Sequence, residues 1–470
     1  MDYRLKIAEN DFEALRRLTL ASWPKEAGAF ALAGVARLPS TTDIIVRRAV
    51  AVPHNQFIVQ HEYRLEVSAE AVNGLISLCE ANGLGAVLCH SHPGKIPYSP
   101  SDDYGEQRIF EILHRFIPEN APTASLLFHP GGVTGRVWLR NGMKPVPLSE
   151  IVVIGSSIHR IYAGDSTEPV RRVDDAVYDR QVRAFGTDGQ ALISRATVGI
   201  VGVGGTGSPT AEQLVRLGVQ DLILVDPDVL EPSNIARVYG TFASQMHRPA
   251  LRFGDRHLWK AKVVSAHLKK INPKVKARVI CENVVQTEVA LALRDRDFLF
   301  LCTDDHWGRS IVNQIAYQYF IPTINLGARI SSDGKSISSA VGVVDILRPE
   351  TPCLWCRQFL RADRIAAESM PRAMRQPLEA EGYVEGVDTT APSVVSMTTT
   401  VSGLGVTLFL HLVTGFMGHS ASIVRLNYDV LEGTIRRGTT LIADKCVCRN
   451  VRGFGDLKDL PTVVDMPGLK

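Results

Sequence analysis

The first 162 residues alternate short apolar runs with stretches of helical periodicity. Residues 69–81 carry apolar side chains at 71, 72, 75, 78 and 79, the stripe expected on an amphipathic helix. The apolar run at residues 84–89 is typical of a short buried strand. Similar patterns predict strands at 43–52, 125–128 and 136–139, and a second helix through Ile109, Phe110, Leu113 and Phe116. The mixture predicts an α+β domain over residues 1–162.

A second domain follows a polar segment that lacks periodicity. Residues 163–175 (AGDSTEPVRRVDD) predict a linker. Beyond it, the chain predicts a strand at 197–201, a glycine-rich loop, a helix at 208–217 and a strand at 222–225, the order that opens a doubly wound α/β domain. We assign residues 176–451 to this domain and 452–470 to a C-terminal tail. Residues 360–387 are charged and contain glycine and proline, which predicts an irregular excursion.

Composition narrows the function classes. Of 470 residues, 45% are hydrophobic and 21% charged, as in ordinary globular proteins, which excludes a disordered chain. The net charge of +3, without a run of like charge, argues against nucleic-acid binding. The N-terminus (MDYRLKIAENDFEALRR) is too charged for a signal peptide, and the uncharged residues 393–418 include five threonines and favour a buried helix over a membrane span. We expect a cytoplasmic protein without membrane contact.

The strand at 84–89 leads directly into His90-Ser91-His92-Pro93. In an extended segment, residues i and i+2 face the same side, so both imidazoles can reach one metal ion. An aspartate, Asp102 or Asp103, follows where the second helix should begin. Two histidines and one aspartate leave a fourth tetrahedral position open, as in catalytic zinc sites. An H-x-H pair alone usually binds nothing, so its surroundings must decide.

Those surroundings resemble the JAMM metalloprotease family of JAB/MPN-type isopeptidases. H-S-H-P followed by Ser99-Pro-Ser-Asp102 is similar to the H-x-H-P and S-x-x-D pattern of that family, and residues 24–34 (PKEAGAFALAG) resemble a loose form of its upstream glutamate segment. The resemblance implies a catalytic Zn²⁺ held by His90, His92 and Asp102, which would lower the pKa of a water to about 7. It also implies that Glu26 is the general base and that Ser99 stabilises charge on the attacked carbonyl. A solvated carboxylate at a helix start is the alternative interpretation of Glu26.

One spacing departs from the family pattern. Six residues (93–98) separate His92 from Ser99, where seven are usual. Either the loop is one residue short and Asp102 is the ligand, or strict counting makes Asp103 the ligand. The S-P-x-D sequence keeps the serine-to-aspartate geometry, which favours Asp102.

A glycine-rich loop, GVGGTG at residues 202–207, lies between a predicted strand and a predicted helix. Glycines let the backbone approach phosphates, and the helix N-terminus favours their negative charge. Asp226 follows Gly202 by 24 residues, at the end of the next strand, where a ribose-binding carboxylate is expected. These features alone also fit an NAD-dependent dehydrogenase.

The neighbouring residues instead resemble the ThiF/MoeB/ubiquitin-activating enzyme family. Residues 226–237 (DPDVLEPSNIAR) are similar to its D-x-D-x-V-x-x-S-N-L-x-R motif. Further similarities are YDRQ at 178–181, KVVSA at 262–266 and CTDD at 302–305. The resemblance covers about residues 176–450. It implies a Rossmann-like domain that uses ATP and Mg²⁺ to adenylate a C-terminal carboxylate.

The resemblance also implies individual roles. Asp304 would hold Mg²⁺, Asp226 would bind ribose, and Arg237 and Lys262 would contact phosphates with support from Asn234. The remaining predicted nucleotide-binding residues are Gly202, Gly204, Gly205, Gly207 and Asp228. Cations are needed because pyrophosphate leaves with negative charge, and a carboxylate suits Mg²⁺. In this family an arginine at the position of Arg180 reaches across a dimer interface, so a homodimer is implied.

Two cysteine pairs, Cys353-Leu-Trp-Cys356 and Cys446-Val-Cys448, suggest a metal site rather than disulfides in a cytosolic chain. They resemble the structural zinc knuckle of the same family, although C-x-x-C is usual where this chain has C-x-C. Four thiolates leave no open position, so the implied Zn²⁺ is structural.

The chain has no cysteine between Arg357 and Lys445, where thioester-forming members of the family carry a nucleophile. The remaining cysteines lie in or beside apolar runs, where buried thiols are usually inert. Either the acyl-adenylate passes directly to a partner or a hydroxyl in this segment accepts it. The sequence does not rank the candidates Ser369, Thr389, Thr390 and Ser393.

Together, the resemblances predict a bifunctional enzyme that trims or deconjugates a small β-grasp protein and adenylates its terminal carboxylate. This carrier would be ubiquitin-like or a sulfur carrier, and a conjugating enzyme is a further open partner. The alternatives are sulfur-carrier processing for cofactor or cysteine synthesis, or one inactive centre retained as a carrier-binding module.

Overall fold

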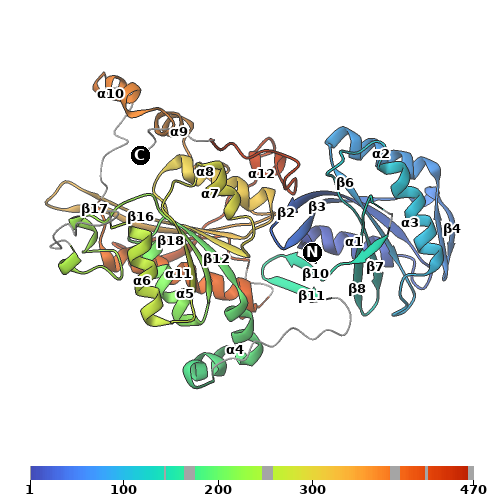
Figure 1. Cartoon of the computed structure of the whole chain (residues 1–470), viewed down its shortest axis with the longest axis horizontal. Coiled ribbons are helices and arrows are strands. Elements are labelled where there is room, and N and C mark those ends of the chain that lie inside the picture. Colours follow the sequence, from blue (N-terminus) through green and yellow to red (C-terminus); the bar gives the residue numbers. More distant parts are fainter. Residues whose placement is uncertain are drawn as a thin grey trace. The chain divides into compact units, whose positions relative to one another are not determined.

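The computed structural model of the chain describes residues 2–141, 144–162, 175–245, 258–381, 392–418 and 422–463. It divides into two compact units (Figure 1). Unit 1 comprises Met1–Pro169, Gln318–Phe320 and Val451–Asp459, and unit 2 comprises the remainder. The predicted linker 163–175 lies outside the described residues except for Asp175, the first residue of helix α4.

Unit 1 contains a nine-stranded mixed sheet in the order β11-β10-β1-β3-β2-β6-β7-β8-β9. Its strands are β1 (Asp2–Ala8), β2 (Gly28–Arg37), β3 (Thr41–Ala51), β6 (Gly85–Ser91), β7 (Thr123–His129), β8 (Gly132–Trp138), β9 (Pro145–Pro147), β10 (Glu150–Ile154) and β11 (Ile158–Tyr162). A separate hairpin pairs β4 (Phe57–His61) with β5 (Arg64–Val67), and the helices are α1 (Glu9–Leu20), α2 (Ala69–Asn82) and α3 (Pro100–Leu113).

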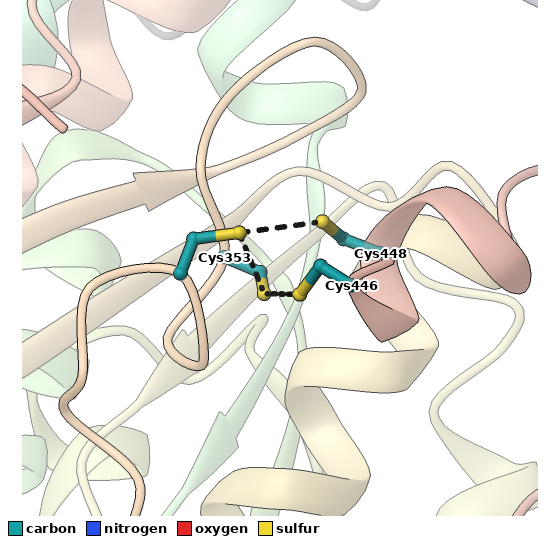
Figure 2. Close-up of side chains that lie close together, drawn as sticks. Cys353, Cys446 and Cys448 are labelled. Atoms are coloured by element: carbon teal, nitrogen blue, oxygen red, sulfur yellow. Dashed lines mark hydrogen bonds between the residues drawn. The ribbon is translucent and has the colours of Figure 1, made fainter. Parts of the chain in front are cut away.

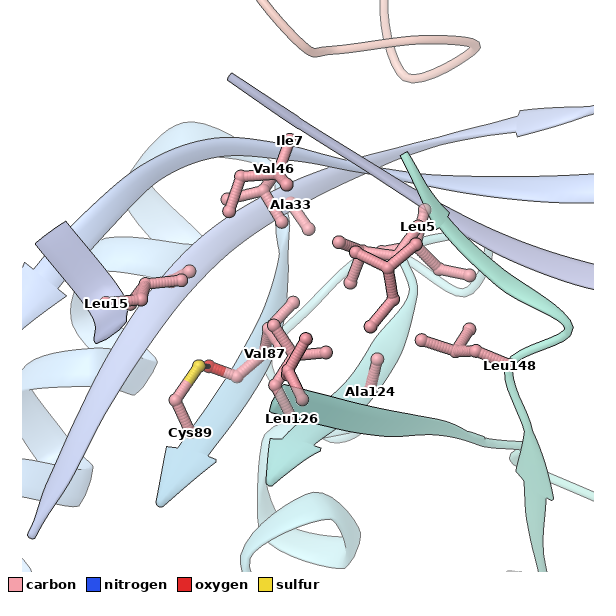
Figure 3. Close-up of a cluster of buried hydrophobic side chains, with 14 of the residues drawn as sticks. Leu5, Ile7, Leu15, Ala33, Val46, Val87, Cys89, Ala124, Leu126 and Leu148 are labelled. Carbon is pink, nitrogen blue, oxygen red and sulfur yellow. Dashed lines mark hydrogen bonds between the residues drawn. The ribbon is translucent and has the colours of Figure 1, made fainter. Parts of the chain in front are cut away.

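Both faces of the unit 1 sheet are buried because successive side chains of a strand point to opposite faces. Along β2, Ala29 and Ala31 enter one apolar cluster with Leu15 of α1, which Figure 3 shows in part. The intervening residues Phe30 and Leu32 enter a second cluster, with side chains of α2 and α3. The α+β prediction for this region agrees with the sheet and its helices.

The segment Val451–Asp459 completes the sheet of unit 1, and we call it the strap. Strand β6 pairs with β2 only as far as Ala33, and the strap takes over at Val35, whose carbonyl accepts a hydrogen bond from Asp456 N at 2.6 Å. A Cβ on Gly34 would lie 2.3 Å from the Gly453 carbonyl, so only glycine admits the strap. The sequence analysis assigned residues 452–470 to a tail, but the strap belongs to unit 1.

Unit 2 contains an eight-stranded sheet in the order β14-β13-β12-β15-β16-β17-β18-β19. Its first five strands are parallel and the rest antiparallel: β12 (Thr197–Val201), β13 (Asp221–Val225), β14 (Lys276–Ile280), β15 (Phe298–Leu301), β16 (Thr323–Ser332), β17 (Ile337–Leu347), β18 (Arg425–Asp429) and β19 (Thr434–Arg437). The helices are α4 (Asp175–Arg195), α5 (Gly207–Leu217), α6 (Lys260–Ile271), α7 (Thr287–Ala292), α8 (His306–Gln318), α9 (Ala362–Glu368), α10 (Arg372–Ala380), α11 (Val395–Thr414) and α12 (Val447–Asn450).

Two expectations need adjustment. Residues 360–387 were expected to be irregular, but they include the short helices α9 and α10, while 382–391 lie outside the described residues. The second helix of unit 1 ends at Leu113, so Phe116 lies beyond it and is exposed. Helix α11 is long and apolar enough to cross a membrane by length and composition alone, yet 50% of its most apolar window is buried and it packs on α5 and β16.

Candidate functional site

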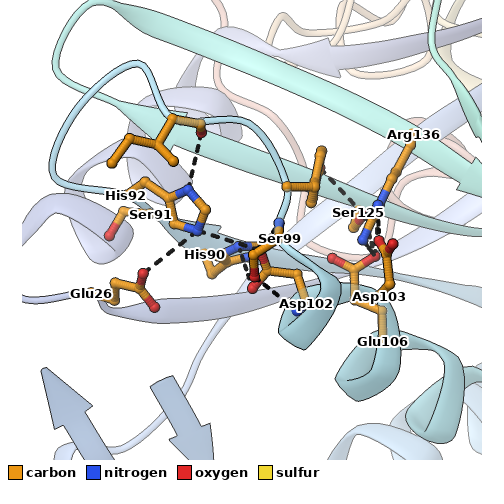
Figure 4. Close-up of polar contacts among 12 residues, drawn as sticks. Glu26, His90, Ser91, His92, Ser99, Asp102, Asp103, Glu106, Ser125 and Arg136 are labelled. Carbon is orange, nitrogen blue, oxygen red and sulfur yellow. Dashed lines mark hydrogen bonds and ion pairs between the residues drawn. The ribbon is translucent and has the colours of Figure 1, made fainter. Parts of the chain in front are cut away.

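Two histidines and an aspartate converge at the end of β6 (Figure 4). His90 lies on β6 and His92 follows the strand, while Asp102 is in the first turn of α3. The Nε2 atoms of His90 and His92 lie 3.5 Å from Oδ1 and Oδ2 of Asp102, respectively. The structure thus brings together the three residues predicted as metal ligands.

The first turn of α3 fixes Asp102 through a capping box. The Ser99 hydroxyl accepts a hydrogen bond from Asp102 N at 3.2 Å, and Asp102 Oδ2 accepts one from Ser99 N at 2.6 Å. Such reciprocal bonds satisfy two backbone donors that a helix start otherwise leaves unpaired. Because the Ser99 hydroxyl accepts from the backbone, its own proton is available to donate.

Glu26 lies beside His92, with Oε1 3.5 Å from His92 Nε2. Its segment is joined to β6 by bonds from Ala27 N to the Ser91 hydroxyl and from Ser91 N to the Ala27 carbonyl. Burial raises the pKa of Glu26, although the two histidines oppose this shift. A buried carboxylate with a raised pKa is suited to proton transfer near neutral pH. Glu26 and the three clustered residues line one cavity of about 210 Å³.

The donor set fits a metal ion. His92 Nδ1 is 3.0 Å from the Ile96 carbonyl, the kind of bond that leaves Nε2 unprotonated and free to bind a metal. His90 Nε2 is buried and has no hydrogen-bond partner among the described residues. Burial acts to raise the pKa of Asp102, but its attraction to His90 and His92 outweighs burial and holds that pKa below its usual range. An ionised carboxylate and two imidazole nitrogens match the ligands of catalytic zinc sites.

Asp103 faces a different partner. Its Oδ1 lies 2.5 Å from Arg136 Nη1 on β8, away from the histidines. The geometry therefore favours Asp102 over Asp103 as the third ligand.

The aspartate pair can be separated by metal analysis. Asp102→Asn should lose the metal because an amide oxygen is neutral and a poorer ligand than a carboxylate. Asp103→Asn should keep it, since its amide oxygen can still accept from Arg136. Zinc measured per chain checks both variants, and retention of all zinc in Asp102→Asn would exclude Asp102 as a ligand.

The four cysteines of the predicted knuckle form a second cluster, in unit 2 (Figure 2). The Sγ–Sγ distances are 3.7 Å for Cys353–Cys356, 3.3 Å for Cys353–Cys446 and 3.8 Å for Cys356–Cys448. All four cysteines are free, since a disulfide requires about 2.05 Å. Four sulfurs around one Zn²⁺, each at about 2.3 Å, stand about 3.8 Å apart. The C-x-C spacing is therefore compatible with one tetrahedral site.

The glycine-rich loop connects β12 to α5. A Cβ on Gly207 would lie 1.9 Å from the Gly202 carbonyl, and one on Gly202 would lie 2.6 Å from Thr303 N, so both glycines allow close backbone packing. A Cβ on Gly204 would meet nothing within 4 Å, which marks the open side of the loop. At Gly205 the nearest side chains are Ser393 and Arg237.

Asp226, at the end of β13, is joined to this loop. Its Oδ2 accepts a hydrogen bond from Val203 N at 2.8 Å, and its Oδ1 accepts one from Asp228 N at 2.9 Å. Burial raises the pKa of Asp226 to about 6, and Asp228 contributes while Lys260 opposes. The lysine facing these carboxylates is Lys260, whose Nζ lies 2.7 Å from Asp228 Oδ2, whereas the predicted Lys262 is exposed.

Asn234 and Arg237 occupy the turn after β13. Asn234 is buried, and its side-chain oxygen accepts from Glu231 N at 3.1 Å, so it shapes the turn. Arg237 N donates to the Asn234 carbonyl at 3.0 Å, which sets Arg237 beside Gly205. Asn234 thus supports the turn after β13, and Arg237 lies beside the glycine-rich loop.

Asp304 follows β15 and is exposed, whereas the neighbouring Asp305 is tied to Thr303 and Gly308. The sequence analysis missed Arg309, a buried arginine that donates to the Thr303 carbonyl at 2.8 Å and supports this segment. It also missed Glu368, whose carboxylate accepts from His306 N and Trp307 N at the start of α8. Arg180 lies exposed on α4.

The structure separates the candidate hydroxyls. The Ser369 hydroxyl donates to the Ala366 carbonyl at 2.9 Å. Ser393 is exposed, and its Oγ lies 3.3 Å from the place of a Cβ on Gly205. Thr389 and Thr390 lie outside the described residues.

Comparisons with known proteins concern mainly the second half of the chain. The ThiF family matches residues 178–450. The molybdopterin-synthase adenylyltransferase of Escherichia coli is 30% identical over 162 residues, 34% of this chain and 60% of that protein. The SAMP-activating enzyme E1 of Haloferax volcanii is 26% identical over 171 residues, 36% and 56% respectively. Ubiquitin-like modifier-activating enzyme 5 of Xenopus laevis is 27% identical over 202 residues, 38% and 46% respectively.

Among solved structures, E. coli MccB with ATP has 16% identity and a TM-score of 0.44 over 59% of this chain and 75% of that one. The chain spans about half the length of the curated relatives it matches. The family match begins at residue 178, after the residues of the histidine cluster. The JAMM-type assignment of residues 1–162 therefore stays a prediction.

Proposed function

We propose, from the premise that this chain belongs to the ThiF family, that unit 2 adenylates the C-terminal carboxylate of a ubiquitin-like or sulfur-carrier protein. The observation that carries the proposal is that the candidate nucleotide-binding and Mg²⁺-binding residues follow three adjacent parallel strands. The glycine-rich loop follows β12, Asp226 follows β13, and Asp304 lies beyond β15. Ligands of open α/β sheets bind beyond the carboxyl ends of such strands.

Each charged residue has a defined task in this reaction. The glycine loop and the N-terminus of α5 would receive the phosphates of ATP, and Asp226 would accept hydrogen bonds from the ribose. Arg237 and Lys260 would neutralise the charge of the departing pyrophosphate. Asp304 is exposed and would hold Mg²⁺, which supplies further positive charge at the phosphates when bound.

Nucleotide binding should depend on the protonation of Asp226. Because its pKa is raised to about 6, Asp226 is ionised above that pH and becomes protonated as the pH falls through it. We expect ATP to bind more weakly at pH 5.5 than at pH 7.5, as measured by calorimetry. Asp226→Asn should bind weakly at both values and lack most of this dependence. If Asp226→Asn keeps the same pH dependence of ATP binding, that dependence comes from ATP itself or from another group of the protein.

We further propose that unit 1 is a zinc hydrolase. It would cleave the bond between the terminal glycine of the same carrier and the group attached to it. The support is the convergence of Glu26, His90, His92 and Asp102 on one cavity. Zn²⁺ held there would polarise the scissile carbonyl and acidify water. Glu26 would take a proton from the attacking water and later deliver one to the leaving amine, and Ser99 would donate a hydrogen bond to the carbonyl oxygen.

The combined proposal is a bifunctional cytoplasmic enzyme that processes and activates one β-grasp carrier. It would act as a homodimer with Arg180 crossing the interface, hold a structural Zn²⁺ at the four cysteines, and deliver the acyl group to an acceptor or a conjugating enzyme. A sulfur carrier for cofactor or cysteine synthesis is the alternative substrate. The other alternative is that one centre is inactive and only binds the carrier.

The decisive experiment uses a ubiquitin-like or sulfur-carrier β-grasp protein with extra residues fused after its terminal glycine. We expect the full chain to remove those residues and then support ATP–pyrophosphate exchange with the trimmed carrier. Exchange without trimming would reduce unit 1 to a binding module. Trimming without exchange would instead mean that unit 2 only binds the carrier.

A further inference from the structure

A second polar cluster lies beside the histidines and joins α3 to strands β7 and β8 (Figure 4). Glu106 Oε2 accepts hydrogen bonds from the Ser125 hydroxyl at 2.7 Å, Trp138 Nε1 at 2.6 Å and Arg136 Nε at 3.1 Å. Arg136 also holds Asp103, so its guanidinium joins two residues of α3. Glu106 and Arg136 are both buried, and their partners come from β7 and β8.

Much of the remaining contact between α3 and the sheet is apolar. Phe110 and Leu113 of α3 pack with Leu88 of β6 in the same cluster as Trp138. A buried ion pair adds little stability over an apolar contact, since both charges must be desolvated. Its bonds are directional, whereas apolar burial is not. The cluster is therefore better explained by its effect on the orientation of α3 than by a contribution to the stability of the fold.

The orientation that it fixes is that of the first turn of α3. Residues 103 and 106 are three apart and share one side of the helix. Arg136 holds both, while Asp102, which directly precedes Asp103 in the sequence, faces the histidines. A rotation of this turn about the helix axis would break the bonds of Arg136 to Asp103 and Glu106. The same rotation would move Asp102 away from the histidines.

Arg136 also supports His90. The Tyr98 ring lies between them, with its centroid 3.7 Å from the Arg136 guanidinium carbon and 5.8 Å from the centre of the His90 ring. The Tyr98 and Ser125 hydroxyl oxygens lie 3.3 Å apart, and this hydrogen bond holds the ring in place. One guanidinium thus supports two of the three metal-binding side chains.

We propose that Arg136 is a positioning residue of the hydrolytic centre, which sets Asp102 through the first turn of α3 and His90 through Tyr98. The inference rests on the hydrolytic half of the proposed function. Groups behind metal ligands commonly change metal affinity by about 10- to 100-fold when they are altered. We therefore expect Arg136 to control the metal site itself.

The test compares Arg136→Lys with Arg140→Lys in the full chain. Lysine keeps the charge but lacks the planar fork that reaches Asp103 and Glu106 together. Arg140 is a matched control because it also ties α3 in place: it donates to the carbonyls of His114 and Ile117, at the other end of the helix.

Zinc affinity is measured by chelator competition, and His92→Ala identifies the part of the zinc signal that belongs to the histidine site. Co²⁺ substitution, with the His92→Ala spectrum subtracted, reports ligand geometry by visible absorption. We expect Arg136→Lys to lower zinc affinity about 10- to 100-fold and to change the Co²⁺ spectrum. Arg140→Lys should lower the thermal midpoint but leave both metal readouts unchanged.

Two outcomes would overturn the inference and are distinguishable. If Arg136→Lys lowers the thermal midpoint but keeps wild-type zinc affinity and Co²⁺ spectrum, Arg136 is structural only, and the hydrolytic proposal survives. If the wild-type chain binds no zinc that His92→Ala removes, the hydrolytic proposal fails and the inference fails with it.

Discussion

Glu26→Gln is expected to keep zinc while losing cleavage of a carrier fusion by about 10²- to 10⁴-fold, the usual contribution of a general base. The variant separates proton transfer from metal binding because Glu26 lies beside His92, with Oε1 3.5 Å from Nε2, but outside the group of three side chains that could hold the metal ion. Glutamine fills the same buried space but cannot take a proton. Cleavage is measured by gel, and zinc content per chain is measured on the same samples.

The matched control is Glu70→Gln, which alters an exposed glutamate in the first turn of α2. It should cleave at the wild-type rate. Wild-type turnover in Glu26→Gln would remove Glu26 from the mechanism. Loss of zinc in Glu26→Gln would instead assign Glu26 to holding the metal.

Asp304→Ala is expected to lower the rate of Mg²⁺-dependent ATP–pyrophosphate exchange about 10²- to 10³-fold. This is the scale expected for the loss of one charge-stabilising contact. Cleavage by unit 1 should be unchanged, because Asp304 follows β15 of the other unit. Asp188→Ala, at an exposed position on α4, is the control and should exchange normally. Wild-type exchange in Asp304→Ala would exclude Asp304 as a metal ligand.

The dimer proposal is tested by mixing two inactive variants. Arg180→Ala should also lose exchange, whereas Arg183→Ala, a neighbouring exposed arginine on α4, should retain it. In a mixed dimer, the Arg180→Ala protomer keeps its own Asp304 and receives the intact arginine of its partner. That site is whole, and the other site carries both defects.

Recovered exchange on mixing would therefore support an arginine that acts across the interface. If Arg180 serves its own protomer, each site carries one defect and neither works. Subunit exchange must be verified first, by co-purification of differently tagged chains. A verified mixed dimer without activity would contradict the proposal.

The sequence was most informative where function depends on local spacing. His90 and His92 share a side because they are two apart at a strand end, and Asp102 joins them because Ser99 and Pro100 start a helix. Neither feature requires knowledge of distant residues. The same holds for the strand–loop–helix unit around Gly202, since its elements are consecutive.

The sequence failed where a choice depends on distant contacts. Lys260 and Lys262 lie two apart on a helix and so point in very different directions; the structure pairs Lys260 with Asp228, and the phosphate contact expected for Lys262 stays a prediction. Strand β2 was missed because its alanine- and glycine-rich sequence has little strand preference and is stabilised by pairing with β3 and β6. Arg136 carried one unused signal: it is a charged residue within a run that otherwise fits a buried strand.

The strap also bears on how the protein is made. Chains emerge from the ribosome N-terminus first, and domains generally fold as they emerge. Residues 1–162 are therefore synthesised early, but the edge of β2 at Gly34 and Val35 stays uncovered until Val451–Asp459 has been translated. A nascent unit 1 must wait until residues 451–459 have been made before its fold is closed. Premature termination before residue 451 would therefore leave the sheet of unit 1 without the strap.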